Sequence, residues 1–367
     1  MTDLDNSLPI VLYHYYYSPY AQRVVWYLNL RGIPYSQCLQ PPIMPRPDLA
    51  RLGVNHRRIP ILSIGRDVYL DTRLIIDKLE QATDLPCARG PLGSPAGGGG
   101  GGKASSPEHR ALEQLLRIFV VDGGVFARAA QLIPHDLPLM RDRRFVRDRN
   151  AFFPGGVAPR ELQPEALTEV QAAMRLLEST LLSDGRAWLL GGGGGGGGGG
   201  AEEEAEGPSL ADLEAVWPLV WLTTLPGALP ADRVSAAQYP RVWAWMDRFK
   251  AAVKRAAPGG KPPTIKGEQA AEAVVNSPFR EASGAIDGDD ATVRADGLAK
   301  GQVVTVWPLD SGSSGRDVGR LVSIDEREVV IEVDVPGSSS GASVRVHAPR
   351  RGFRVRPHVA EPAAANL

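Results

Sequence analysis

Residues 57–79 read RRIPILSIGRDVYLDTRLIIDKL, and this stretch decides the fold. The apolar run Ile61–Ile64 predicts a strand, Gly65 can adopt the positive φ of a tight turn, and Val68–Leu70 favours a second strand. Asp71 or Thr72 can cap a following helix. The apolar positions of that helix include Leu74, Ile75 and Leu79. The stretch therefore predicts a strand, a turn, a second strand and a helix.

Pro60 stands at the start of this unit and restricts how the unit can be used. Proline cannot donate a hydrogen bond to a sheet, so it belongs at a strand start or an edge. If the peptide bond before Pro60 is cis, the main chain of Ile59 turns outward and can pair with the backbone of a peptide ligand. The helix N-terminus after Leu70 suits a carboxylate. The alternative interpretation is a hairpin and a capped helix that bind nothing.

The preceding residues predict a β-α-β order. Pro9–Tyr13 favours a buried strand, Pro19–Arg31 a helix that ends at Gly32, and Ile33–Leu39 a second strand. Ser18 and Pro19 are residue types favoured at the N-cap and at the first position of a helix. Together with the unit at Pro60, this is the thioredoxin-like order, in which Ser18 and Pro60 lie together.

Two segments resemble the glutathione transferases. Residues 18–24 are similar to the Ser-Pro-Phe/Tyr-x-x-Arg-Val segment of serine-type, fungal-like members. Ile59-Pro60 and Asp71-Thr72 are similar to the family's Val/Ile-Pro step and Glu/Asp-Ser/Thr pair. The resemblance implies that Ser18 is catalytic and that glutathione is the co-substrate, without a metal. The residues that it implies for glutathione binding are Tyr17, Arg58, Ile59, Pro60, Asp71 and Thr72.

A serine hydroxyl has a direct use in this chemistry. A free thiol has a pKa of about 8.5, so little thiolate forms at neutral pH. A hydroxyl donor and a helix N-terminus both favour the anion. Ser18 could also be a simple N-cap, and Tyr17 or Tyr15 could supply the hydroxyl instead, although tyrosines at a strand end also serve to pack. No cysteine stands at position 18, and Cys38 is expected to be inert in the core.

Residues 106–257 predict an all-helical domain. Ser106-Pro107 and Tyr239-Pro240 each open a helix, and Ser209 with Asp212 has near capping-box spacing. The preceding linker, 91–105, is glycine-rich, and the glycine run 191–206 predicts a disordered loop. Phe119, Phe126 and Trp221 could line an electrophile pocket, or they could be ordinary helix-bundle core.

The C-terminal residues lie outside the two-domain pattern of the family. Residues 258–285 predict a connector with one short helix, 286–358 predict five short strands in a small antiparallel barrel or sandwich, and 359–367 a tail. Arginines gather near the end of this module, at Arg345, Arg350, Arg351, Arg354 and Arg356. Residues 286–358 nevertheless hold ten Lys/Arg against eleven Asp/Glu, so a mixed, solvated surface is favoured over a nucleic-acid patch.

The composition agrees with a multidomain α+β protein. The net charge is −1 and 43% of residues are apolar, which argues against a global electrostatic role with nucleic acid or membranes. Two cysteines, no evident signal peptide and no membrane-spanning stretch lead us to expect a cytoplasmic protein, and the resemblance implies a homodimer. The expected function is transfer of the glutathione thiolate to a small hydrophobic electrophile. The alternative is a catalytically inactive regulatory or scaffold protein with the same fold.

Overall fold

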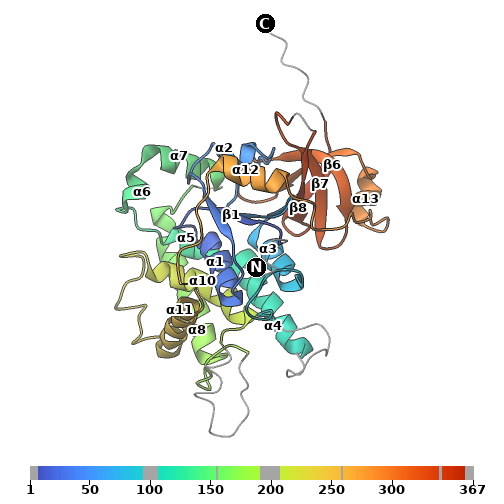
Figure 1. Ribbon diagram of the computed structural model, residues 1–367. Helices are drawn as coiled ribbons and strands as arrows, with labels where there is room; N and C mark the ends of the chain where they lie inside the picture. The colour runs from blue at the N-terminus through green and yellow to red at the C-terminus, as the bar shows by residue number, and fades with distance from the viewer. Residues whose placement is uncertain are drawn as a thin grey trace. The chain divides into compact units, whose positions relative to one another are not determined.

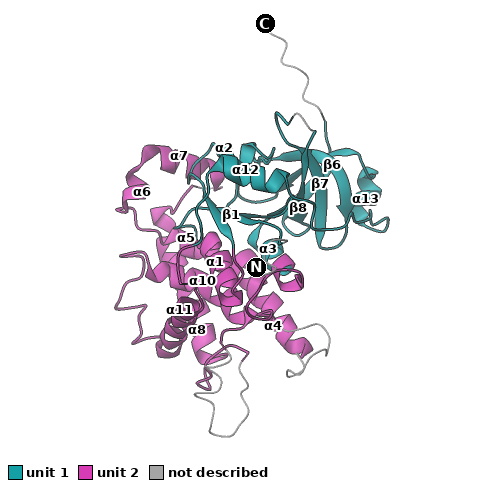
Figure 2. Ribbon diagram, viewed as in Figure 1, with its two compact units in different colours: residues 1–18, 35–77, 262–367 teal, residues 19–34, 78–261 magenta. Residues whose placement is uncertain are grey.

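The chain forms two compact units, each built from separate parts of the sequence. The computed structural model describes residues 7–93, 106–153, 156–190, 207–257, 259–338 and 341–359 (Figure 1). The first unit comprises residues 1–18, 35–77 and 262–367, and the second comprises 19–34 and 78–261 (Figure 2). The glycine run 191–206, most of the linker 91–105 and nearly all of the tail 359–367 lie outside the described residues. The domain boundaries expected from the sequence stay a prediction.

The first unit contains the strands that the N-terminal sequence predicts. They are β1 (Ile10–His14), β2 (Ser36–Leu39), β3 (Ile61–Ile64) and β4 (Asp67–Leu70). β1 runs parallel to β2 and antiparallel to β3, and β3 is antiparallel to β4. A single helical turn, α2 (Pro47–Ala50), lies between β2 and β3, and α3 (Thr72–Gln81) follows β4 as the sequence predicts. The predicted strand, turn, strand and helix of residues 57–79 are therefore confirmed.

All five C-terminal strands are also confirmed, but they do not form a separate barrel or sandwich. They are β5 (Val303–Pro308), β6 (Asp317–Ile324), β7 (Glu328–Asp334), β8 (Ser343–Pro349) and β9 (Phe353–Pro357). β8 pairs in parallel with β4, so the sheet continues in the order β2-β1-β3-β4-β8-β7-β6-β5-β9. The order of the described strands has two ends, β2 and β9, and the expectation of a closed, independent module is corrected.

The physical reason for the continued sheet is the edge of β4. Without β8, β4 would present unpaired main-chain groups, and proteins commonly cover such an edge. One hydrophobic core then runs beneath both halves of the sheet. It includes Val68 and Leu70 of β4 together with Val346 and Ala348 of β8.

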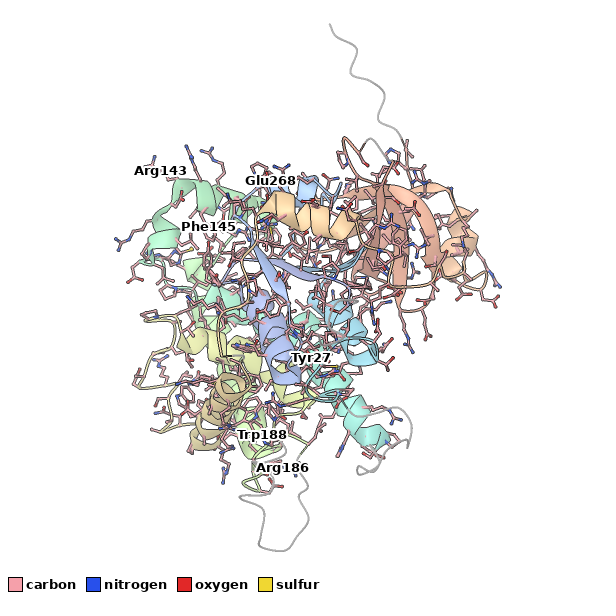
Figure 3. The ribbon with its side chains drawn as sticks, viewed as in Figure 1. Tyr27, Arg143, Phe145, Arg186, Trp188 and Glu268 are labelled. Atoms are coloured by element: carbon pink, nitrogen blue, oxygen red, sulfur yellow. The ribbon has the colours of Figure 1, made fainter. Side chains whose placement is uncertain are left out.

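The connector before the added strands also packs on the first unit. It contains the predicted helix, α12 (Gly267–Val275), and α13 (Ala291–Asp296) follows it. Ala270 and Val274 of α12 lie in the same core as the sheet residues. Arg51, just after α2, forms an ion pair with Glu268 in the first turn of α12. Figure 3 labels Glu268 on this helix.

The second unit is helical. Its helices are α1 (Pro19–Arg31), α4 (Pro107–Arg117), α5 (Val125–Gln131), α6 (Pro138–Arg141), α7 (Arg143–Phe152), α8 (Gln163–Ser179), α10 (Leu210–Thr223) and α11 (Pro240–Ala256). A π-helical turn (Ile118–Asp122) and a 3-10 turn (Arg160–Leu162) connect some of them. The predicted caps are confirmed: Ser106 accepts a hydrogen bond from the amide of His109, and Ser209 and Asp212 form a capping box.

Asp212 does more than cap α10. Its Oδ1 accepts hydrogen bonds from the indole Nε1 of Trp245 at 2.7 Å and from the amide of Leu189 at 2.9 Å. Leu189 follows Trp188, which is buried beyond the end of α8 (Figure 3). The carboxylate therefore ties α10 to α11 and to the segment after α8. No helix within the described ranges is both long enough and apolar enough to cross a bilayer.

Candidate functional site

The predicted site residues of the first unit meet at one end of its sheet. Tyr13 pairs with Ile61, and Ile61 pairs with Leu70. The end of β1, the start of β3 and the end of β4 therefore lie at the same end of the sheet. Ser18 follows β1, Ile59-Pro60 precede β3, and Asp71-Thr72 follow β4. We call this end of the strands the site edge. It is distinct from the outermost strands, β2 and β9, of the sheet.

Ser18 lies at the site edge in a buried turn. Its side chain is 3% exposed, and its amide donates to the carbonyl of Tyr15 at 3.1 Å. Tyr17, the neighbouring predicted residue, is 46% exposed, and its ring centroid lies 4.8 Å from that of Tyr15. The hydroxyl of Tyr16 accepts a hydrogen bond from Gln37. Tyr15 and Tyr17 thus pack against each other and Tyr16 bonds to a residue of β2, and the site role of Tyr17 stays a prediction.

The peptide bond between Ile59 and Pro60 is cis, which meets the condition set in the sequence argument. Both residues are buried, and β3 begins directly after Pro60. Thr72 is also buried, at the first position of α3.

Asp71 has an unusual conformation and close cationic partners. Its φ is +67°, which a non-glycine residue rarely adopts. Arg73 binds its carboxylate through Nε at 2.9 Å and Nη2 at 2.8 Å, and Arg58 Nη1 lies 3.6 Å away. Burial by itself would raise the pKa of Asp71, but the two guanidinium groups outweigh burial and hold that pKa below its ordinary value. Asp71 is therefore an anion between two arginines.

Residues of the C-terminal strands also reach the site edge, and the sequence analysis missed them. Arg58 forms an ion pair with Asp310, and its Nε and Nη2 donate to the carbonyl of Ser311 at 2.9 and 2.6 Å. A Cβ on Gly352 would lie 3.1 Å from Nη2 of Arg73. The turns after β5 and β8 thus contact both arginines beside Asp71. The pairing of β8 with β4 brings these turns to the site edge, and no local sequence pattern predicts that pairing.

The segment before Ile59 is held by the same strands. The amide of Asn55 donates to Oδ1 of Asp317 at 2.6 Å, and the ring of His56 stacks on that of Phe353 at 5.6 Å. A Cβ on Gly315 would lie 2.7 Å from the amide nitrogen of Arg57, so only glycine fits there. The C-terminal strands therefore fix the main chain that leads into the site edge.

The C-terminal arginines are partly neutralised within the first unit. Arg350 binds Asp290 at 2.7 Å and Arg356 binds Asp296 at 2.7 Å. The guanidinium of Arg354 lies 5.9 Å from the ring centroid of Trp307. These contacts favour the mixed surface over a phosphate-binding patch.

In the second unit, two of the three proposed pocket residues come together. The rings of Phe126 and Trp221 lie 5.8 Å apart, and Phe126 also contacts Tyr20 at 4.6 Å and Trp217 at 4.8 Å. Phe119 lies in the π-helical turn after α4, and its ring joins none of these contacts. The four rings form an aromatic cluster, and of its members the sequence analysis named only Phe126 and Trp221, as pocket or core residues.

Two family models match parts of this chain. Residues 12–87 match the family model described as "Glutathione S-transferase, N-terminal domain". Residues 128–258 match a second family model, described as a domain of unknown function (DUF7962). No curated protein matches the sequence.

Among solved structures, a GST-like protein from Pseudomonas syringae is similar over nearly the whole chain. It is 23% identical, covers 95% of this chain and 99% of its own, and has a TM-score of 0.65. The chain has a glutathione transferase-like fold. A match over 95% of the chain also has to include most of the C-terminal strands. Rice GST1 in complex with glutathione is 19% identical over 73% of this chain and 96% of its own, with a TM-score of 0.46.

Proposed function

We propose that this chain binds glutathione at the site edge and transfers its thiolate to a small hydrophobic electrophile. The observation that supports the proposal most is the sheet register, because it brings Ser18, Ile59-Pro60 and Asp71-Thr72 to one end of the sheet. The family match over residues 12–87 includes all of these residues. The homodimer and the electrophile belong to the proposal and rest on the sequence resemblance. The cytoplasmic location belongs to it too and rests on the composition.

The residues at the site edge contact different parts of glutathione. The hydroxyl of Ser18 donates to the glutathione sulfur, and the start of α1 adds the favourable end of a helix dipole, so the thiolate is stabilised. The main chain of Ile59 pairs with the cysteinyl backbone. Asp71 and Thr72, with Arg58 beside them, bind the charged γ-glutamyl end, and Tyr17 flanks the ligand.

Replacement of Ser18 tests the catalytic role. We expect Ser18→Ala to lower the rate of conjugation to an aryl halide about 10- to 100-fold, because one hydrogen bond to a charged group is lost. The pKa of the bound glutathione thiol should rise, which ultraviolet absorbance of the thiolate measures. Ser18→Thr retains a hydroxyl and should recover most of the rate. Wild-type activity in Ser18→Ala would remove Ser18 from the mechanism.

The alternative, a protein of this fold without transferase activity, has an observation in its favour. The carboxylate of Asp71 and the guanidinium of Arg58 already bind groups of the protein, including Asp310. A ligand has to compete with those contacts. Calorimetric titration with glutathione separates the two functions: a saturable heat below millimolar ligand supports the enzyme, and no heat at millimolar ligand supports the inactive protein.

The contact between Arg58 and Asp310 gives a second expected result. The side chain of Asp310 is 71% exposed, so the ion pair is worth at most about 1 kcal/mol. Asp310→Ala leaves the guanidinium of Arg58 with less competition for a ligand carboxylate. We expect the Kd for glutathione to fall about two- to fivefold in calorimetry. Glu326→Ala, which removes another exposed acid of the same unit, should leave the Kd unchanged.

A weaker Kd in Asp310→Ala would contradict this arrangement. It would mean that Asp310 positions Arg58 for the ligand and does not compete with it.

A further inference from the structure

A group of acidic side chains surrounds a buried histidine in the first unit, away from the site edge. His347 lies on β8 opposite Tyr69 of β4, and the two rings are 4.7 Å apart. Glu328 begins β7, and Glu281 precedes β5 in the connector. Asp67 begins β4, about 10 Å along the strand from Leu70, where the site edge begins. The group therefore has no residue in common with the proposed glutathione site.

Three side chains of this group have the spacing of metal ligands. One ligand atom each from Glu281, Glu328 and His347 lies within 4.8 Å of the others. Nδ1 of His347 is 3.0 Å from Oε2 of Glu328. Ligands at 2.0–2.2 Å from one ion are about 3–4 Å from each other, so only a small inward movement is needed. The side chains are 2% exposed for His347, 13% for Glu328 and 24% for Glu281, so the group is unlike a cluster of surface acids.

Asp67 forms hydrogen bonds that position two of the three ligands, His347 and Glu281. Its Oδ1 accepts from Nε2 of His347 at 2.9 Å, which leaves Nδ1 as the atom that faces the glutamates. Its Oδ2 accepts from the amides of Arg280 and Glu281 at 2.6 and 3.0 Å. Metal-binding histidines commonly donate their second ring N–H to a carboxylate in this way. The hydroxyl of Tyr69 donates to Oε1 of Glu281 at 2.7 Å and orients that carboxylate as well.

The group opens onto a cavity and carries a surplus of negative charge. A cavity of about 370 Å³ is lined by all three side chains and by Asp287, Asp325 and Arg345. The guanidinium of Arg345 lies 4.0 Å from the ring centroid of Phe279 and donates to the main-chain carbonyl of Glu281. Arg280 lies 3.8 Å from Oε1 of Glu281. Three carboxylates thus converge on one imidazole, with the guanidinium groups of Arg280 and Arg345 beside Glu281.

We propose that Glu281, Glu328 and His347 bind one first-row divalent cation, with an open coordination position toward the cavity. This differs from the sequence expectation of a protein without a metal. One imidazole with two carboxylates suits Zn²⁺ or Mn²⁺, whereas Mg²⁺ and Ca²⁺ prefer oxygen ligands alone. The three residues are far apart in the sequence, so no short spacing motif could reveal the site.

Titration of the metal-free full-length protein with Zn²⁺ and Mn²⁺ tests the site. We expect one Zn²⁺ per chain in calorimetry, with Mn²⁺ binding more weakly and Mg²⁺ weaker still. Glu328→Gln and Glu281→Gln should each weaken Zn²⁺ binding at least about tenfold, because each removes a charged ligand. Glu326→Gln is the matched control: it changes an exposed glutamate of the turn before β7, and the affinity should not change.

Crystals grown with Zn²⁺ locate the ion directly. An anomalous difference peak between the three side chains supports the proposal. Circular dichroism of each variant shows whether it is folded. If Glu328→Gln unfolds, the loss of Zn²⁺ affinity is measured in Glu281→Gln, whose substitution lies in the connector. No stoichiometric binding overturns the proposal, because the group is then a charge network around His347. Binding that both variants leave unchanged also overturns it, because the ion then binds elsewhere.

Discussion

Glu214→Gln is expected to destabilise the second unit by about 3–5 kcal/mol. Glu214 lies in α10 with no exposed surface, and it pairs with two arginines from other helices. Arg23 of α1 is fully buried and bonds to Oε2, and Nε of Arg117 of α4 lies 3.0 Å from Oε1. Removing this carboxylate takes away an acceptor that both guanidinium groups share, in a medium that stabilises charge poorly, and this costs more than the lost attraction.

Urea denaturation followed by tryptophan fluorescence measures this loss. Of the seven tryptophans, all but Trp307 belong to the second unit, so the signal reports mainly on the unit that contains Glu214. Asp247→Asn is the matched control. It breaks an exposed ion pair with Lys250 one helix away, and such pairs contribute about 0–1 kcal/mol. A loss in Glu214→Gln no larger than in this control would show that the two arginines do not depend on the carboxylate.

A combined variant separates charge from packing. Arg23→Met, Arg117→Met and Glu214→Leu together remove all three charges while they keep roughly the same volume. Replacing a buried charged triad with apolar side chains can be neutral or stabilising. We therefore expect the triple variant to be more stable than Glu214→Gln, although it differs more from the natural sequence.

The sequence predicted the elements well because each has a local signal. The caps at Ser106 and Ser209 depend on residues close together in the chain, and the structure confirms them. The parallel pairing of β4 with β8 joins residues about 280 positions apart, such as Val68 and Val346. Apolar strands look alike in sequence whichever partner they have, so the pattern predicted a separate module.

The candidate site shows the same division. Short motifs allowed the sequence analysis to name Ser18, Ile59-Pro60 and Asp71-Thr72. The sheet register then brings these residues to one end of the sheet. Asp310 was missed because its contact with Arg58 depends on the long-range strand pairing. The contact of Arg73 with Asp71 was missed too, although the two stand two residues apart, because no pattern in the sequence marks this bidentate contact.

Opposite pH dependences are expected from two buried groups that join the C-terminal strands to residues 55 and 56. Burial, reinforced by the positive charge of Arg58, lowers the pKa of His56 to about 3 from an ordinary value of 6.5. Burial raises the pKa of Asp317 to about 7 from 3.8, although the amide of Asn55 donates to its carboxylate. Each group therefore binds protons differently in the folded and unfolded states.

The signs of the two contributions follow from where the proton is held. Between pH 4 and 6.5 the unfolded chain protonates His56 and the folded chain does not, so this contribution to stability is lost as pH falls. In the same range the folded chain protonates Asp317 and the unfolded chain does not, so this contribution is lost as pH rises toward 7. Each group changes the free energy of unfolding by at most about 1.4 kcal/mol per pH unit. In the wild type the two changes have opposite signs and largely cancel.

Two single variants separate these slopes. His56→Phe keeps a ring to stack on Phe353 and leaves Asp317 as the titrating group, so stability should fall with rising pH relative to the wild type. Asp317→Asn keeps an acceptor for the amide of Asn55 and leaves His56, so stability should rise with pH. The two slopes should differ by up to about 2.7 kcal/mol per pH unit between pH 4 and 6.5, measured by denaturation at each pH. Parallel curves would mean that these side chains are open to water and that the C-terminal strands do not hold the segment before Ile59.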